Sequence, residues 1–360
     1  MTSKSPAAAT LKQLATRAGL SLAAVSYALR DDKKIPESTR RRVQDLARQL
    51  GYRPNPRIAA LMAHIRRSHG PSAGERIAFV WVHTPRDESK RDSFLQLVFH
   101  GARQRAEQLG YILEEFYLEE TGINARRLSD ILKTRGIAGV VFSPVMHEAT
   151  VRLDFAWEYF SCAVIGHAQW LPELHHAGHH HYHAMRCALE ELGELGYKRP
   201  AVILDAAANE RGRRAWQAAF LVFHPLQHKA STFVLGDLPA TGQRLMRWLA
   251  TSKPDVVILH RSEMVARFSQ FCPAKHRPDI CTLHWSPDLK NIAGIDQRFD
   301  LVASNAVDLV VNQLITNERG APAVPRVTLF PGQWVPSPAL TGRSLATPSV
   351  KSPQVPRAPV

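Results

Sequence analysis

The first fifty residues alternate apolar and polar positions in the way that short helices do. Apolar residues at spacings of three and four predict a helix that begins near residue 11. They are Leu11, Leu14, Ala15 and Ala18. Thr10 with Gln13 is typical of a helix start, and Gly19 predicts the end of this helix because glycine readily adopts a left-handed backbone. Ser21 predicts the cap of a second helix.

The second helix has one face for packing and one face left open. Val25, with Ala28 or Leu29, is expected to pack against the first helix. The open face then carries Leu22, Ala23, Ser26, Tyr27 and Arg30. Two helices joined by a glycine-containing turn predict a helix-turn-helix unit, whose second helix enters the major groove of DNA. Packed helix pairs also occur in enzymes, so this pattern alone leaves that alternative open.

A third helix follows. Pro36 and Glu37 suit a first helical turn, where proline needs no donor partner and a carboxylate meets the positive end of the helix dipole. Its apolar stripe is formed by Val43, Leu46, Ala47 and Leu50. Gly51 is expected to end it, so the pattern predicts a small unit of three helices.

From residue 76 onward, apolar runs alternate with amphipathic stretches. The predicted strands are 77–82, 112–117, 139–143, 162–165, 201–204, 256–259, 280–283 and 327–331. The predicted helices are 94–109, 125–134, 183–195, 213–223, 243–249, 263–271 and 301–316. Alternation of this kind predicts an α/β core of parallel, doubly wound sheets, which bind ligands at the carboxyl ends of their strands.

Charge strengthens the interpretation of the N-terminal unit. The chain of 360 residues has a formal net charge of +14. Its first seventy residues hold fourteen Lys or Arg and four Asp or Glu, so they contribute most of that excess. Basic charge concentrated on a small helical unit is typical of phosphate binding. On this ground we expect Lys12, Arg17, Arg30, Lys33, Arg40 and Arg53 to contact DNA phosphates.

Composition excludes several other classes. The four cysteines have no paired spacing, so we expect reduced thiols. No apolar run approaches the ~20 residues that span a bilayer, and the N-terminus does not read as a signal peptide. Secretion and membrane insertion are therefore disfavoured, and we expect a cytoplasmic protein without a membrane partner. Residues 68–75 have linker composition, and the Pro- and Ser-rich segment 341–360 predicts a disordered tail.

Several short motifs occur together and in register. They are the sequence Ala-Gly-Leu-Ser at 18–21, Val25-Ser26, Gly51-Tyr52 and Pro54-Asn55. With them, the segment from residue 10 to about 62 resembles the DNA-binding headpiece of the lactose-repressor (LacI/GalR) family of bacterial transcription regulators. The resemblance extends more loosely to about residue 335. It implies a headpiece at 9–55, a hinge helix at 56–67 and a two-lobed core at 76–340 that is similar to periplasmic sugar-binding proteins.

The resemblance also implies roles in DNA binding. The base-reading positions are Leu22, Ala23 and Tyr27, and their mostly apolar character favours contacts to thymine methyl groups. Lys12, Ser21, Ser26, Arg30, Arg53 and Asn55 are the expected phosphate and positioning contacts. Leu61 matches the hinge residue that wedges into the minor groove and bends the duplex. The alternative is that Leu61 is an ordinary packing residue of that helix.

In the core, the resemblance implies one lobe at about 76–168 and 294–320 and a second at about 169–293 and 321–340. The family's sugar-binding residues have largely changed: Trp216 stands in place of an arginine, Arg261 in place of an amide, and His284-Trp285 in place of a turn with an aspartate. Gln297 keeps the family residue. A free hexose is therefore disfavoured, and a different carbohydrate, an anionic ligand or no ligand remain open.

Strand ends supply further candidates for ligand contact. His83, Ser143, Asp205 and Trp285 follow predicted strands at their carboxyl ends. The alternative is that each is an ordinary loop residue.

Six histidines crowd the segment from 174 to 183. They are His175, His176, His179, His180, His181 and His183. Such a cluster suggests a zinc or nickel site, but no His-Glu-x-x-His motif and no adjacent cysteine accompany it. We expect an exposed loop that leads into a helix near His183, with neither a metal nor another cofactor.

Together these features predict a transcriptional regulator, most simply a repressor, and not an enzyme. We expect a homodimer on a pseudo-palindromic operator, because two-fold protein symmetry calls for two-fold DNA symmetry. A small-molecule effector between the lobes would tune operator affinity. The alternatives are an activator of the same family, a solute-binding protein without a regulatory role, and a metal-dependent hydrolase built on the histidines.

Overall fold

The computed structural model describes residues 11–29, 35–50, 52, 75–118, 122–146, 148–225, 231–235, 241–272, 277–289 and 291–340. The expectations for Arg30, Lys33, Arg53, Asn55 and Leu61 lie outside these residues, as do those for the hinge helix and the tail. Within the described chain, no helix is long and apolar enough to cross a membrane.

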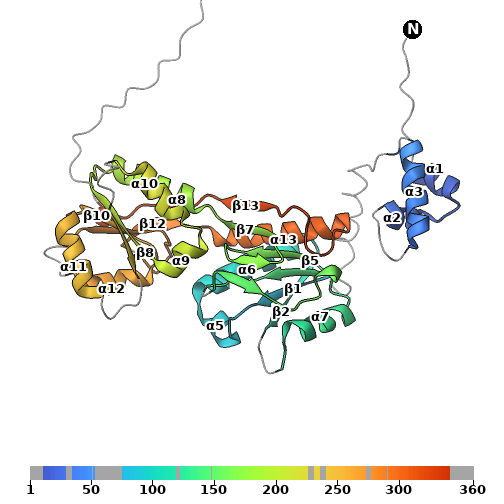
Figure 1. Ribbon diagram of the computed structural model, residues 1–360, viewed down its shortest axis with the longest axis horizontal. Helices are drawn as coiled ribbons and strands as arrows, with labels where there is room; N and C mark the ends of the chain where they lie inside the picture. The colour runs from blue at the N-terminus through green and yellow to red at the C-terminus, as the bar shows by residue number, and fades with distance from the viewer. Residues whose placement is uncertain are drawn as a thin grey trace, which may run out of the picture.

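The N-terminal unit has the three expected helices: α1 (Leu11–Ala18), α2 (Leu22–Leu29) and α3 (Glu37–Gln49), shown in blue in Figure 1. Gly19 has a φ of +66° and ends α1, while the Ser21 hydroxyl accepts a hydrogen bond of 3.1 Å from the Ala24 N–H at the start of α2. One shared core joins the helices. It contains Leu14, Ala15, Ala18, Val25, Ala28, Val43 and Ala47.

The first lobe is built on a parallel sheet with the strand order β13-β7-β5-β3-β1-β2. Its strands are β1 (Arg76–Trp81), β2 (Ile112–Tyr117), β3 (Gly139–Phe142), β5 (Ser161–Ile165), β7 (His175–His179) and β13 (Val327–Phe330). A small sheet of β4 (Thr150–Arg152) and β6 (Gln169–Leu171) accompanies it. The central strands are buried because helices cover both faces, as a parallel sheet requires.

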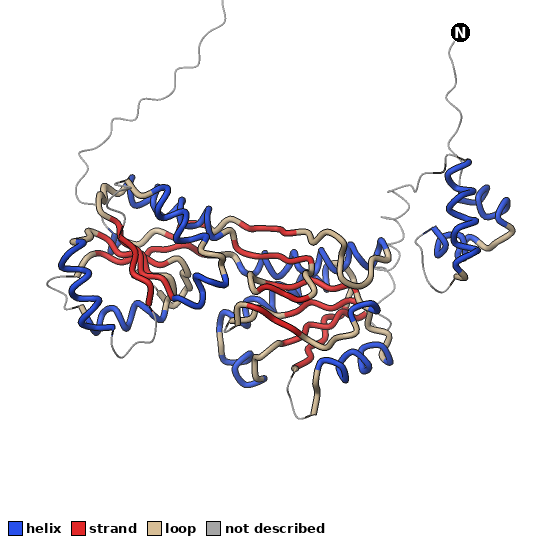
Figure 2. The backbone as a smooth tube through the Cα atoms, viewed as in Figure 1, coloured by secondary structure: helices blue, strands red, loops and turns tan. Residues whose placement is uncertain are grey.

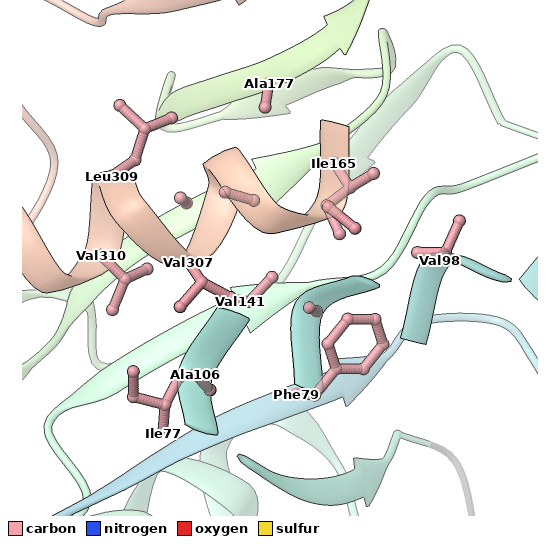
Figure 3. Packing of buried hydrophobic residues seen from close by; sticks show 14 of the residues in the cluster. Ile77, Phe79, Val98, Ala106, Val141, Ile165, Ala177, Val307, Leu309 and Val310 are labelled. Atoms are coloured by element: carbon pink, nitrogen blue, oxygen red, sulfur yellow. The ribbon is translucent and has the colours of Figure 1, made fainter. Parts of the chain in front are cut away.

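Two helices, α6 (Ser93–Gln108) and α13 (Phe299–Thr316), pack side by side on one face of this sheet. Figure 3 shows the aliphatic contacts that result, with Val307 and Val310 of α13 near Ile77 and Val141 of the sheet. The other face is covered by α7 (Ala125–Thr134), while α5 (Arg86–Arg91) precedes α6. A short 3-10 helix, Trp157–Tyr159, leads into β5.

The second lobe has a sheet with the strand order β14-β12-β11-β10-β8-β9. Its strands are β8 (Pro200–Asp205), β9 (Ser231–Leu235), β10 (Val256–Leu259), β11 (Asp279–Thr282), β12 (Ala293–Asp296) and β14 (Gln333–Val335), of which β14 is antiparallel. On one face lie α8 (His181–Glu194) and α10 (Ala215–Phe223), and on the other α11 (Thr241–Ser252) and α12 (Glu263–Phe271). The short helix α9 (Ala206–Arg211) follows β8, and the 3-10 helix Pro338–Leu340 ends the described chain.

The chain passes between the lobes three times, after β7, after β12 and after β13 (Figure 2). The passages lie together: a Cβ on Gly332 would come within 2.9 Å of the His179 ring and 3.0 Å of the Asp296 carbonyl oxygen. These positions differ from the expected boundaries, because β7 and β13 pair in the first sheet and β12 pairs in the second. The chain crosses from one lobe to the other near residues 180, 297 and 331.

Candidate DNA-binding surface and inter-lobe cleft

The helix-turn-helix geometry places the expected base-reading positions on α2. Leu22, Ala23, Ser26 and Tyr27 belong to this helix, and Lys12 belongs to α1. The inward side of α2 is occupied by Val25 and Ala28, which are fully buried, whereas Tyr27 is only partly buried. Side chains at the other four positions lie outside those described, so their contacts remain expectations.

The arginines of α3 are partly engaged in holding the unit together. Arg42 donates to the Ala18 carbonyl oxygen at 3.2 Å and so ties α3 to the end of α1. Arg40 donates to the Ile35 carbonyl oxygen at 2.6 Å. Arg17 on α1 is exposed, as a phosphate contact would require.

A small cavity of about 80 Å³ lies between the two lobes of the core. Its polar lining residues are His167, His181, Arg211, Trp216, His260, Arg261, His284 and Gln297. Phe94 and Phe299 of the first lobe also line it, and Phe94 meets the His284 ring of the second lobe edge-on, with ring centroids 5.2 Å apart. Three expected ligand contacts, Trp216, Arg261 and Gln297, therefore line one cavity.

The other four expected contacts do not line this cavity. The Ser143 hydroxyl accepts a hydrogen bond from the Val82 N–H at 3.0 Å. Asp205 caps α9 by accepting from the Ala208 N–H at 2.8 Å. His83 lies 3.5 Å from Glu148, and Trp285 is a partly buried loop residue. Ser143 and Asp205 thus have local structural roles, and ligand contact by any of the four stays a prediction.

Histidines that were not among the expected contacts make up much of the cavity wall. His167 follows β5, His260 follows β10 and His284 follows β11. His181 begins α8 and stacks on Trp216, with ring centroids 3.6 Å apart and an interplanar angle of 7°. The strand-end signal was therefore present in the sequence for His260 and His284.

The buried imidazoles are held neutral. Burial lowers the pKa of His260 well below its ordinary value, and His284, Arg261 and Arg211 act in the same direction. Burial likewise lowers the pKa of His181, and it lowers the pKa of His167 to about 4. Uncharged rings therefore surround the cavity at neutral pH.

Three buried polar atoms of this wall have no hydrogen-bond partner among the described residues: Nδ1 of His181, Nε1 of Trp216 and Nδ1 of His260. Leaving such a group unsatisfied costs about 1–3 kcal/mol. Unsatisfied groups gathered at one cavity are typical of a binding site, where a ligand or water supplies the missing partner.

The histidine-rich segment differs from its prediction as an exposed loop. His175–His179 forms the buried strand β7, which pairs with β5 and β13. His175 bridges Glu318 at 3.0 Å and accepts from the Arg326 N–H at 2.8 Å, while Nε2 of His167 donates to the His179 carbonyl oxygen at 2.7 Å. Within the described chain, no group of three metal-ligating side chains is arranged to hold an ion.

A larger cavity of about 400 Å³ adjoins the small one. Both are lined by His167, His181, Arg211 and Gly212. The larger cavity adds Arg213, Tyr182 and Trp170 to its wall. The two together provide a narrow end and a roomier end.

The chain thus carries a helix-turn-helix unit followed by a two-lobed α/β core. Residues 10–55 match the family model for bacterial regulatory proteins of the lacI family. The match is confined to the N-terminal segment, and the core is similar in fold to solved structures.

Two similar proteins illustrate these matches, one in sequence and one in structure. The repressor CytR of Escherichia coli (strain K12) is 45% identical over 53 residues, which are 15% of this chain and 16% of CytR. The matched segment is thus a small part of the relative's length. A putative LacI-family transcriptional regulator from Rhizobium etli has a TM-score of 0.56 at 14% identity, covering 74% of this chain and 99% of that one.

The lac repressor dimer bound to operator and the anti-inducer ONPF has a TM-score of 0.50 at 16% identity, over 91% of this chain and 98% of that chain. At sequence identities of 14% and 16%, these similarities show a shared fold.

Proposed function

We propose that this chain is a sequence-specific DNA-binding transcriptional regulator, most simply a repressor that acts in the bacterial cytoplasm. The observation that carries the proposal is the basic three-helix unit at the N-terminus, which matches the lacI family model over residues 10–55. Its second helix is capped by Ser21 and packed through Val25 and Ala28, so its opposite face is left for the major groove.

Two such chains would bind the two half-sites of a pseudo-palindromic operator. Phosphate contacts from Lys12, Ser21, Ser26, Arg30, Arg53 and Asn55 would position the unit, and Leu22, Ala23 and Tyr27 would read the bases. Leu61 would enter the minor groove at the centre of the operator.

A small molecule in the inter-lobe cavity would regulate this binding. The three passages between the lobes lie side by side at Gly332, and such crossings are where lobes rotate against each other. A ligand that favours one lobe angle would bias the DNA-bound state, and operator and ligand would change each other's affinity by the same factor.

Replacement of Tyr27 by Ala tests the DNA-reading face. Tyr27 is partly buried and is not a member of the headpiece core, so its loss should leave the fold intact. We expect specific operator binding to weaken about tenfold while binding to scrambled DNA changes little, as for one lost base contact. Both affinities are measured by filter binding at one salt concentration.

Arg48→Gln is the matched control, since Arg48 pairs with Asp45 on the exposed surface of α3 and does not belong to α2. Equal losses on operator and scrambled DNA in the Tyr27 variant would show that Tyr27 does not read sequence.

A further inference from the structure

We propose that the inter-lobe cavity takes a small anionic group, a phosphate ester or a carboxylate, held by Arg211, Arg261 and the buried ring N–H groups around them. This inference rests on the proposed function and names the chemical class of its effector. It depends on the donors and acceptors of the wall, its charge, and the size of the two adjoining cavities.

The described wall of the small cavity has several donors, two of them cationic, and no anionic acceptor. Trp216 and the two arginines can only donate, and the neutral rings of His181 and His260 can each offer their unpartnered nitrogen as a donor. Side-chain acceptors are limited to Oε1 of Gln297, whose Nε2 donates to the Leu283 carbonyl oxygen at 2.6 Å, and the second nitrogen of each neutral ring; none of them carries a negative charge. A sugar hydroxyl donates as well as accepts, whereas an anion only accepts.

Charge points the same way. Among the described residues that line the small cavity there is no Asp or Glu, whereas Arg211 and Arg261 both line it. The two guanidinium groups lie close enough to affect each other and the His260 ring, because each lowers the pKa of that histidine. Their positive potentials therefore overlap at the ring whose Nδ1 lacks a partner.

The arginines are only partly neutralised by their surroundings. Arg261 lies 3.3 Å from Glu263, a carboxylate whose side chain is 63% exposed to solvent. Arg211 is partly buried, and burial lowers its pKa while Asp205 opposes that effect. No hydrogen bond joins the Arg211 guanidinium to another described residue. An anion in the cavity would supply one.

The small cavity by itself has room for a charged group but not for a whole sugar ring. About 80 Å³ holds two or three waters, which is the space of a phosphate or carboxylate. The body of a larger ligand would extend into the adjoining cavity of about 400 Å³, past the shared residues His167, His181 and Arg211. The stack of His181 on Trp216 fixes two donors in position before the ligand arrives.

Thermal unfolding of the full chain without DNA tests the proposal. The probes are glucose 6-phosphate, citrate and glucose, each up to about 20 mM at constant ionic strength, because a ligand that binds the folded state raises its Tm. We expect at least one anion to raise the Tm in a saturable way and glucose to leave it unchanged. The two anions separate a phosphate ester from a carboxylate as the preferred group.

Arg211→Gln and Arg261→Gln should each weaken binding of that anion about tenfold or more, the loss expected for a charge-assisted hydrogen bond. Arg214→Gln is the matched control: it lies near Arg211 in sequence, pairs with Glu210 and lines neither cavity. It also tests for anions held by the basic headpiece, since such binding would be the same in all three variants. If the arginine variants do not fold, Trp216→Phe removes one donor and should weaken binding severalfold.

Three outcomes would overturn the proposal: no Tm rise with either anion, glucose binding as tightly as the anions, or wild-type anion affinity in both arginine variants. Operator binding is measured separately on the same proteins without anion. If the wild-type protein binds the operator but neither anion, this inference alone is refuted. If the wild-type protein does not bind an operator, the proposed function is refuted.

Discussion

Acidification should destabilise the core through the histidines that surround the inter-lobe cavity. The clearest case is His167, whose pKa is lowered to about 4 by burial and then by His176, with its hydrogen bond to the His179 carbonyl oxygen opposing the shift. In the unfolded chain the same ring has a pKa near 6.5. Between these values the unfolded state binds a proton that the folded state does not bind.

The sign and magnitude follow from this difference. Above pH 6.5 the ring is neutral in both states, and its contribution to stability is fully present. As the pH falls from 6.5 toward 4, the free energy of unfolding decreases, by about 3 kcal/mol for a gap of this size. His181 and His260, whose pKa values are also lowered by burial, act in the same direction.

Urea unfolding between pH 7 and pH 4.5 measures the effect on wild type and His167→Gln. Glutamine retains a donor for the His179 carbonyl oxygen and does not titrate, so the variant should lose less stability on acidification. The control is His100→Gln, because His100 is exposed on α6 and should leave the profile unchanged. Identical pH profiles for wild type and His167→Gln would refute the assignment of a buried neutral ring.

Two further predictions concern the hinge and the core. Leu61→Ala should reduce operator bending, because a smaller side chain cannot wedge the base step, and unchanged bending by fluorescence energy transfer would remove the wedge role. Gly101→Ala should lower the free energy of unfolding by about 3 kcal/mol or more, since its Cβ would lie 2.3 Å from the Asp300 carbonyl oxygen where α6 meets α13. Gly193→Ala on α8 has open space and should stabilise by about 1 kcal/mol, so equal urea midpoints for the two variants would contradict the packing.

Much of the architecture could be predicted because the hydrophobic pattern determines it directly. The run around β1 is apolar on both faces, as expected for a strand covered by helices on each side, and α7 begins and ends where its pattern predicts. The stripe on α1 identified the headpiece core for the same reason.

The histidine-rich strand could not be predicted from that pattern. β7 is buried by its neighbours β5 and β13, which come from distant parts of the chain, and Gly178 leaves room for the His167 ring at 2.8 Å from where a Cβ would lie. A local sequence of histidines gives no sign of that burial. The lobe boundaries in the structure differ from the expected ones for the same reason: β7 and β13 join the first sheet through long-range pairing.

The cavity was only partly predicted. The family resemblance predicts Trp216, Arg261 and Gln297 as ligand contacts, and all three line the cavity. The strand-end rule alone predicts Ser143 and Asp205, whose side chains instead accept hydrogen bonds from nearby backbone N–H groups. A position at the carboxyl end of a strand therefore indicates the edge of the sheet at which ligands bind. The hydrogen bonds of each side chain then decide whether that residue is available to a ligand.

Selection of bound fragments from a bacterial genome by the purified full chain tests the central claim most directly. The account predicts enrichment of a sequence with two half-sites related by two-fold symmetry, retained at moderate salt and lost as salt rises. Recovery of fragments without a common sequence, or no salt-sensitive retention at all, would contradict it.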